Sequence, residues 1–357
     1  MFRRSALAKH GFTSTGSFFS RRNLAALAAI HRGILEVEDS GIKSKLLFVF
    51  TAILPRASKR YQWGPKRPLN AQNQTYYVAP VFLEWNVFDL FRRKLDAVKR
   101  SDSYIEEEIG ALWLDQIDVR YELGSAEDLT FLASESVDYV FTDPPFGGNI
   151  FYSDMNLFQE AWLGAITDSS REAVIPTNGN RQAATDHYRD LLTAALREGF
   201  RVLKPGNHLS LMFSNSSGEV WSLAQQAIHD AGFEIEADGV CLLDKGQRSV
   251  KGLSSGYENV VTTDLVLTMR KPDRSGRRSV SPPDERLEES VRTVLGEGLP
   301  VATPSRLYLR VVRRYLHKGW DLSGLDYGHV MKAAADEGMA VDARSGRFLI
   351  DVEKDTG

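Results

Sequence analysis

The sequence has a single cysteine, Cys241, among 357 residues. One cysteine excludes an intramolecular disulfide framework and any cysteine-rich zinc or iron–sulfur site. The seven histidines are scattered, and none has a carboxylate or cysteine partner at the spacing of a metal ligand set. We therefore expect no metal centre, and a protein of a reducing compartment such as the cytoplasm.

Long hydrophobic runs are also lacking. The longest, Leu46–Leu54, has nine residues, far fewer than the roughly 20 that span a bilayer as a helix. No membrane span is therefore expected. Hydrophobic residues make up 43% and charged residues 25% of the chain, which is ordinary globular usage and excludes a disordered or fibrous protein.

Acidic residues are scarce at the beginning of the chain. The net charge of −3 hides this, since 44 Lys and Arg face 47 Asp and Glu overall. Residues 1–67 contain 13 basic and 3 acidic side chains, whereas the remaining 290 residues contain 31 basic and 44 acidic ones. A basic arm thus precedes an acidic body, and such an arm favours a nucleic-acid partner.

The last basic residues of that arm belong to a polar stretch, 56–77, which prolines break into a loop. They alternate with Tyr61 and Trp63, an interleaving that suits a phosphate backbone and unstacked bases. A solvated loop with two rings tucked onto the body fits these residues equally well. The candidate nucleic-acid-binding residues are Arg56, Lys59, Arg60, Lys66 and Arg67.

Hydrophobic periodicity separates a helical region from an α/β region. The helices expected early in the chain cover 23–35, 43–54 (closed by Pro55) and 87–100. Short strands are then expected at 117–123, 137–142, 209–213 and 264–269, with helices at 187–200 and 219–231. Strands that alternate with helices predict an open, mainly parallel sheet.

These patterns divide the chain into four segments. A basic helical region covers 1–110 and an α/β core covers 111–271. An exposed linker rich in Ser and Pro follows at 272–285, beginning beside Lys271. The last segment, 286–357, combines helices with a final strand and predicts a small winged-helix-like module; these elements are expected at 287–295, 305–316, 328–336 and 347–350.

The most informative stretch is the predicted strand 137–142 with the residues that follow it, Asp143, Pro144, Pro145 and Phe146. The carboxyl end of a strand in an open α/β sheet is where ligands bind. An exocyclic amino group of a base is a poor nucleophile, and two acceptors, the Asp143 carboxylate and the Pro144 carbonyl, suit its two hydrogens. Successive prolines fix these acceptors beforehand, and Phe146 suits stacking on an extruded base. An Asp-Pro turn that closes a strand is the simpler alternative.

The stretch Phe141–Asp154, followed by Phe158 and Trp162, resembles the catalytic motif of amino-methylating DNA methyltransferases, whose cofactor is S-adenosylmethionine. Other segments are similar to a bacterial subgroup of that family with a long helical insertion: Arg22–Leu27, Phe48–Leu54, Thr75–Val78 with Glu84 and Asn86, and Thr303–Tyr308. The resemblance implies a Rossmann-like methyltransferase sheet with a helical N-terminal insertion, in which Asp143, Pro144, Pro145 and Phe146 form the amino-group site.

The resemblance also implies cofactor contacts. The segment Gly124–Leu129 matches the place where the family contacts the adenine end of S-adenosylmethionine, although Ser125 replaces the usual acid there. The candidate cofactor-binding residues are Ser125, Ala126, Glu127 and Asp143.

One part of the family pattern is missing. The family carries a glycine-rich turn, Phe-x-Gly-x-Gly, where the chain passes close to the cofactor, and an acid about 20 residues later that holds a ribose, as in dinucleotide sites. Neither is found in this sequence. We expect the chain to begin after that turn, and a second polypeptide to supply it or the isolated chain to bind the cofactor weakly.

These patterns predict a DNA methyltransferase that acts on an exocyclic amino group. Asp at position 143 favours adenine-N6 over cytosine-N4, because the resembling cytosine enzymes more often carry Ser there. Cys241 is not placed as a nucleophile, and direct transfer needs none. The alternatives are an RNA amino-methyltransferase and a non-catalytic DNA-binding subunit. The segment Ser214–Gly218 either lines the pocket or caps a helix.

Overall fold

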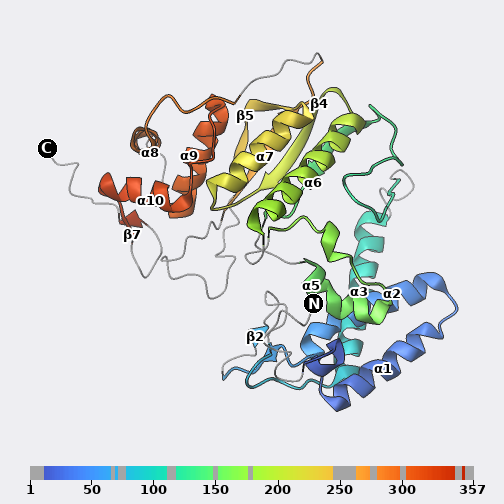
Figure 1. Cartoon of the computed structure of the whole chain (residues 1–357). Helices are drawn as coiled ribbons and strands as arrows, with labels where there is room; N and C mark the ends of the chain where they lie inside the picture. The colour runs from blue at the N-terminus through green and yellow to red at the C-terminus, as the bar shows by residue number, and fades with distance from the viewer. Residues whose placement is uncertain are drawn as a thin grey trace. The chain divides into compact units, whose positions relative to one another are not determined.

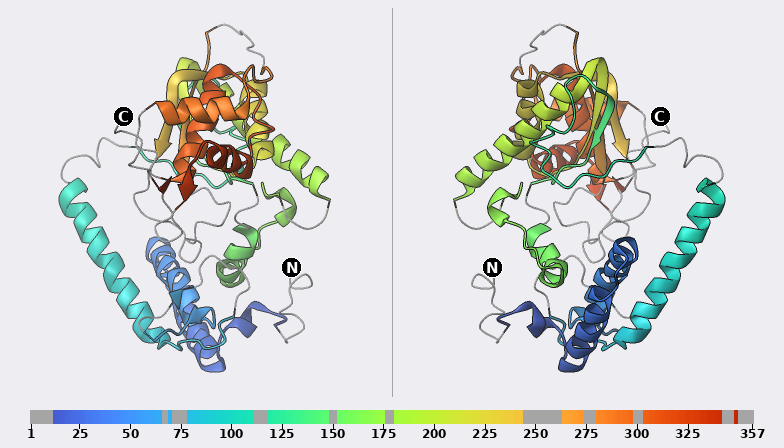
Figure 2. Two further views of the ribbon diagram at one scale, coloured as in Figure 1. Left: turned by 90° about the vertical axis from the view of Figure 1, so that its left-hand side faces the viewer. Right: turned by 90° about the vertical axis from the view of Figure 1, so that its right-hand side faces the viewer.

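The structure, a computed structural model, is shown in Figures 1 and 2. It describes residues 12–65, 69–70, 78–110, 118–147, 152–175, 180–243, 263–273, 280–297, 303–341 and 348–349. The chain forms two compact units, each considered by itself. The helical unit comprises 1–122 and 150–172, and the sheet unit comprises 123–149 and 173–357. The units group the residues differently from the four predicted segments, because 150–172 join the helical unit and 286–357 join the sheet unit.

The helical unit is built on three long helices, as predicted. They are α1 (Arg21–Leu35), α2 (Ser40–Ala57) and α3 (Val87–Ile105), and each begins at a polar residue whose side chain accepts a backbone N–H. Shorter elements complete the unit: η3 (Thr15–Phe18), β1 (Tyr61–Gln62), β2 (Leu69–Asn70), η4 (Glu106–Gly110), α5 (Tyr152–Leu163) and η5 (Ser169–Arg171).

The predicted end of the second helix is wrong. Helix α2 continues through Pro55 to Ala57, although proline cannot donate the helical hydrogen bond at its position. Ile53, Leu54 and Ala57 are all buried in the core of the unit. Burial of these side chains on the last turn offsets the loss of one hydrogen bond.

The sheet unit contains a four-stranded sheet in the order β3-β4-β6-β5. Its strands are β3 (Val137–Thr142), β4 (Leu203–Phe213), β5 (Glu234–Leu243) and β6 (Asp264–Arg270). Strands β3 and β4 are parallel, whereas β6 is antiparallel to both of its neighbours, β4 and β5. The α/β class is therefore confirmed, but the prediction of a mainly parallel sheet is wrong.

The error comes from strand β5, which the sequence analysis missed. Its first half alternates acids with apolar residues, so no apolar run marks it. The pairing of β5 with β6 shifts register between Ile235 and Val240. Gly239 lies in this shift, where an added Cβ would meet the Thr268 carbonyl oxygen at 2.5 Å. Only glycine permits that close approach of the two strands.

Two helices, α6 (Arg181–Val202) and α7 (Gly218–Ala231), lie side by side on one face of the sheet (Figure 1). Both were predicted. Helix α7 ends at Gly232, whose φ of 95° is the left-handed conformation that glycine favours at a helix end. The buried side chains of this layer include Leu209, Leu211, Phe213 and Trp221. They place the core of the unit beneath the two helices.

Strand β3 forms an edge of the described sheet, although a mostly apolar run such as Val137–Thr142 is typical of a buried strand. Tyr139 and Phe141 are exposed, and within the described residues no strand pairs with the outer side of β3. The predicted strand at 117–123 is also absent over its described part, 118–123. Val119, Tyr121 and Leu123 are 80%, 89% and 94% exposed. A strand needs a partner for its backbone groups, and this segment has none among the described residues.

The three C-terminal helices and the last strand, β8 (Phe348–Leu349), were predicted, whereas its partner β7 (Ala340–Val341) was not. The helices are α8 (Leu287–Gly296), α9 (Pro304–Lys318) and α10 (Tyr327–Asp336), and the two strands pair antiparallel. Their buried side chains belong to the same core as the sheet. The backbone N–H of Gly218 donates to the Asp326 carboxylate at 2.8 Å, so this segment packs directly on α7. Its likeness to a winged helix stays a prediction.

Lys271, which lies beside the predicted exposed linker, is buried. Its ammonium donates to the Leu203 carbonyl oxygen at 2.7 Å and lies 4.8 Å from the centre of the Phe200 ring. The cation is retained in the interior because a carbonyl and an aromatic face replace water. No helix in the described part of the chain is long and apolar enough to cross a bilayer.

Candidate functional site

The Asp-Pro-Pro-Phe motif leaves the sheet at the carboxyl end of β3, as predicted. Asp143 is exposed, and Pro144, Pro145 and Phe146 are half-buried. Gly147 follows with a φ of 93°, a conformation that other residues adopt only with strain. The glycine lets the chain turn inward immediately after the motif.

Two side chains from other elements bind the backbone of the motif. The Tyr188 hydroxyl, on α6, donates to the Pro145 carbonyl oxygen at 2.7 Å. The Asn215 amide, in the loop after β4, donates to the Phe146 carbonyl oxygen at 2.6 Å. Burial raises the pKa of Tyr188 well above its ordinary range, so the hydroxyl keeps its proton and remains a donor.

Asn215 is itself held at both ends. Its side-chain oxygen accepts from the Ser217 backbone N–H at 2.8 Å, and its backbone carbonyl accepts from the Trp221 indole N–H at 2.9 Å. From sequence, the segment 214–218 either caps a helix or lines the pocket. The available signal was its position after β4, since the carboxyl ends of parallel strands such as β3 and β4 lie at the same edge.

A row of three aromatic rings, Phe146, Phe213 and Trp221, joins the motif to the core of the sheet unit. The Phe146 ring lies 5.4 Å from Phe213 at 65°, and Phe213 lies 5.0 Å from Trp221 at 75°. Both are edge-to-face contacts of the favoured kind. The row fixes Phe146 on the core of the sheet unit.

Hydrogen bonds from Tyr188 and Asn215 engage two backbone carbonyls of the motif. The Pro145 and Phe146 carbonyls are occupied, whereas the Pro144 carbonyl accepts no hydrogen bond from any residue that the structure describes. Neither proline has an N–H. The Pro144 carbonyl lies next to Asp143 in the chain, and this carbonyl and the Asp143 carboxylate are the pair of acceptors predicted for an amino group.

The segment with the predicted cofactor contacts forms a turn. The Asp128 N–H donates to the Ser125 carbonyl at 3.1 Å; Ser125 and Glu127 are half-buried, and Ala126 is exposed. Because the preceding residues 118–123 join no strand, the described residues do not by themselves fix this turn in a sheet. Without a strand that holds the turn, the described residues do not form a site that fits the cofactor.

An ion pair that the sequence analysis missed anchors the chain just after this turn. Glu198 accepts the Leu129 N–H at 2.9 Å, and Arg201 donates to the Leu129 and Leu132 carbonyls at 2.9 and 3.0 Å. The two side chains also bind each other at 2.8 Å. The hydrogen bond from Arg201 is the largest cause that lowers the pKa of Glu198 to about 2.

The predicted nucleic-acid-binding residues that the structure describes do not all lie in an exposed loop, contrary to expectation. Arg56 is exposed on the last turn of α2, but the Lys59 ammonium donates to the Ser17 carbonyl at 2.9 Å. Arg60 is only 4% exposed, and its guanidinium lies 4.7 Å from the centre of the Phe158 ring. Burial lowers the pKa of Arg60. Lys66 and Arg67 lie outside the described residues.

The sequence predicts neither a metal centre nor a nucleophilic cysteine. In the ranges that the structure describes, no group of three or more His, Cys, Asp or Glu side chains is placed to hold a metal ion. Cys241 is exposed on β5 and free.

Comparisons with known proteins found no matching family and no matching curated protein. Among solved structures, the chain is similar to a "Putative DNA Modification Methylase" from Thermus thermophilus. The structure of that protein complexed with S-adenosyl-L-methionine matches at 18% identity over 54% of this chain and 74% of that chain, with a TM-score of 0.28. Its selenomethionine derivative matches at 17% identity over 54% and 72%, with a TM-score of 0.26.

Proposed function

We propose that this chain is an S-adenosylmethionine-dependent DNA methyltransferase that acts on an exocyclic amino group, adenine-N6 in preference to cytosine-N4. The observation that carries the proposal is the placement of Asp143 and Pro144 at the carboxyl end of β3, with the next two carbonyls tied by Tyr188 and Asn215. The choice of adenine rests on the resemblance of the motif, through Asp143. The Rossmann-like fold and the cofactor rest on the same resemblance.

In this proposal the chain prepares the amino nitrogen. The Asp143 carboxylate and the Pro144 carbonyl accept its two hydrogens, which draws the nitrogen toward a tetrahedral shape and frees its lone pair. The acceptors are held in advance, so little reorganisation is needed during the reaction. The carboxylate also accepts the proton that the nitrogen must lose. S-adenosylmethionine, when bound, supplies the methyl group.

Other predicted residues have further roles in this proposal, each considered within its own unit. The Phe146 ring stacks on the target base after the base has been extruded from the DNA double helix. The contact with Phe213 keeps the Phe146 ring in place. Arg56 is the described member of the predicted basic set that remains exposed for DNA. The residues Ser125, Ala126 and Glu127 contact the cofactor only when the turn that contains them is fixed.

We also propose that the active protein includes a second polypeptide that carries the glycine-rich turn. The edge of β3, with which no described strand pairs on its outer side, supports this proposal, because an added strand would pair there. The same observation favours a second function, a non-catalytic DNA-binding subunit, if no such strand is supplied.

The test is methyl transfer by the chain purified from cells that also express its flanking genes. Transfer of a tritiated methyl group to DNA is expected, with little transfer to RNA. Asp143→Asn keeps the shape of the side chain and should lower the rate at least about 100-fold, the loss typical of a removed oxyanion-type contact. Asp138→Asn is the matched control, an exposed strand residue paired with Lys204.

Three outcomes separate the candidate functions. Labelled DNA that depends on Asp143 and not on Asp138 supports the proposal. Labelled RNA alone would favour the RNA amino-methyltransferase. Binding of DNA without label would favour the non-catalytic subunit. Calorimetry with S-adenosylmethionine tests the second polypeptide, since micromolar affinity for the chain alone would contradict it.

A further inference from the structure

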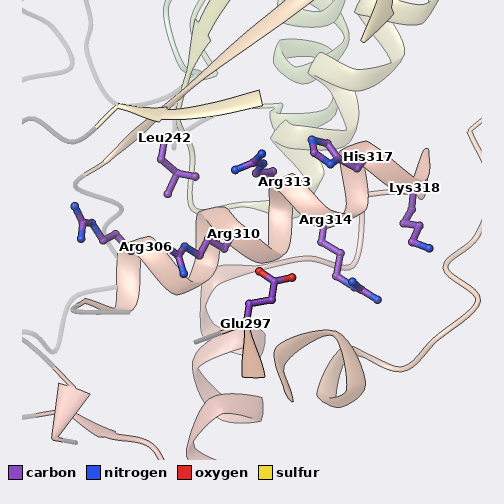
Figure 3. Close-up of a pocket in the computed structure, with 8 residues that line it drawn as sticks. All are labelled: Leu242, Glu297, Arg306, Arg310, Arg313, Arg314, His317 and Lys318. Atoms are coloured by element: carbon purple, nitrogen blue, oxygen red, sulfur yellow. The ribbon is translucent and has the colours of Figure 1, made fainter. Parts of the chain in front are cut away.

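A basic cavity of about 540 Å³ lies in the sheet unit on helix α9. Leu242 of β5 and Glu297 border it, and Figure 3 shows that its remaining side chains come from α9. These are Arg306, Arg310, Arg313, Arg314, His317 and Lys318. These basic side chains cluster on α9 although residues 68–357 as a whole are acidic, with 13 more acidic than basic side chains.

The cations are aligned by the pattern of the helix. Arg306, Arg310, Arg313 and His317 are spaced by four, three and four residues, which places them on one face. Leu307, Val311 and other apolar residues of the opposite side are fully buried in the core. The core thus fixes the rotation of α9, and the basic row extends for about 16 Å at 1.5 Å per residue.

Some of these cations already have internal partners. Arg314 donates to both Glu285 carboxylate oxygens, at 2.8 and 2.9 Å. The Lys318 ammonium lies 5.8 Å from the centre of the Trp320 ring. The Arg314 guanidinium is thus neutralised by an internal carboxylate, and Lys318 contacts an aromatic ring.

Arg310 and Arg313 differ from the others. One terminal nitrogen of Arg310, Nη1, is buried without a hydrogen-bond partner. Arg313 has neither an ion pair nor a hydrogen bond with any residue in the described ranges. Burial is the largest cause that lowers the pKa of Arg310; the nearby Glu297 raises it, and Arg306 and Arg313 lower it. A buried donor without an acceptor is unfavourable, and an anion at this place would satisfy it.

We propose that the cavity on α9 binds the phosphate backbone of a nucleic acid, through Arg310 and Arg313 together with the row that they belong to. Guanidinium groups match phosphate oxygens in pairs, and a row of about 16 Å suits successive phosphates better than one isolated anion. This site is separate from the Asp143 motif and does not depend on methyl transfer. It supplies a binding surface in place of the predicted basic residues Lys59 and Arg60, which are engaged elsewhere.

The test is the affinity of the full chain for a labelled DNA duplex of about 30 base pairs, measured by fluorescence anisotropy between about 50 and 200 mM salt. The variant with Arg310→Gln and Arg313→Gln removes two phosphate contacts. Each contact contributes about 0.9 to the salt slope on B-DNA, which corresponds to about 8-fold in affinity at 0.1 M salt. We expect a loss of about 60-fold and a slope smaller by about 2.

The matched control removes two charges elsewhere in the same unit, with Arg197→Gln and Lys332→Gln, both exposed. It should change the affinity less than about 3-fold. Glu297→Gln removes the acid that borders the cavity and should tighten binding, a gain that a misfolded protein cannot produce. Duplex RNA should depend on the same two arginines, because the contact is to phosphate.

Two results would overturn the proposal. One is equal loss of affinity in the cavity variant and in the control, which would indicate only a general effect of charge. The other is micromolar binding of inorganic phosphate by the wild-type protein while the cavity variant binds DNA normally, which would identify a site for a single phosphate group.

Discussion

We predict that the Tyr188 hydroxyl, on α6, holds the Asp-Pro-Pro-Phe motif in place. The substitution Tyr188→Phe tests this, because it removes the hydroxyl and keeps the ring. The tyrosine is 1% exposed, and its hydroxyl donates to the Pro145 carbonyl at 2.7 Å. Because the ring remains, no large cavity forms. The loss is that of one hydrogen bond plus a carbonyl left without its donor, about 1–2 kcal/mol.

The expected loss appears at the motif itself. Pro144 and Pro145 have no N–H, so the first amide after Asp143 belongs to Phe146. A loss of about 1.4 kcal/mol is a tenfold change in an equilibrium, so the amides of Phe146 and Gly147 should exchange with solvent deuterium about tenfold faster if they exchange by local opening. Hydrogen exchange read by mass spectrometry on the isolated chain measures this.

Tyr308→Phe is the matched control. Tyr308 is fully buried in the same unit, and its hydroxyl donates to the Leu325 carbonyl at 3.0 Å. Its removal should lower the free energy of unfolding by a similar amount but leave exchange at Phe146 unchanged. If the Tyr188 variant leaves that exchange unchanged, or if both variants speed it equally, Tyr188 does not position the motif.

Two other predictions concern the anchors of the sheet unit. Lowering the pH from about 4.5 to about 2 should release the loop that begins at Leu129, because the pKa of Glu198 is depressed to about 2 in the folded chain and its stabilisation is lost as the carboxylate is protonated. Hydrogen exchange of the backbone amides in this loop measures the release. In the Glu198→Gln variant, the stability of the loop against opening should no longer depend on pH over this range. Gly218→Ala should lower the thermal midpoint by several degrees, since its Cβ would lie 2.5 Å from the Leu322 carbonyl. Gly324→Ala has open space around the new methyl group, and a midpoint equally lowered there would contradict the explanation.

The helices were the most predictable part of the chain. Their apolar residues recur at helical spacing, and α1, α2 and α3 begin at residues whose side chains accept a backbone N–H. Both signals are local in the sequence. The motif at 143–146 was likewise predicted at the end of a strand, which the structure confirms.

The contacts that hold the motif could not be predicted, because they join distant parts of the chain. Tyr188 lies 43 residues after Pro145, and Asn215 lies 69 residues after Phe146. Which residues meet depends on the parallel pairing of β3 with β4, and a sequence pattern does not specify which strands become neighbours.

Burial was misjudged where residue type and environment disagree. Val119, Tyr121 and Leu123 are exposed because no described strand pairs with their segment, whereas the cationic Arg60 and Lys271 are buried beside aromatic rings. Long cationic side chains have apolar stems and faces that pack well. Charge in the sequence therefore did not indicate exposure at these two positions.

The contacts within the sheet unit form a continuous path from the basic helix to the motif. The Trp320 carbonyl, two residues after α9, accepts from Gln225 of α7. The Asp326 carboxylate accepts from Gly218 at the start of α7, and Asn215 just before that helix donates to Phe146. A phosphate held on α9 and a base held at Asp143 would therefore be kept at one fixed separation. That separation would determine how many nucleotides lie between the bound phosphate and the base that reaches the motif.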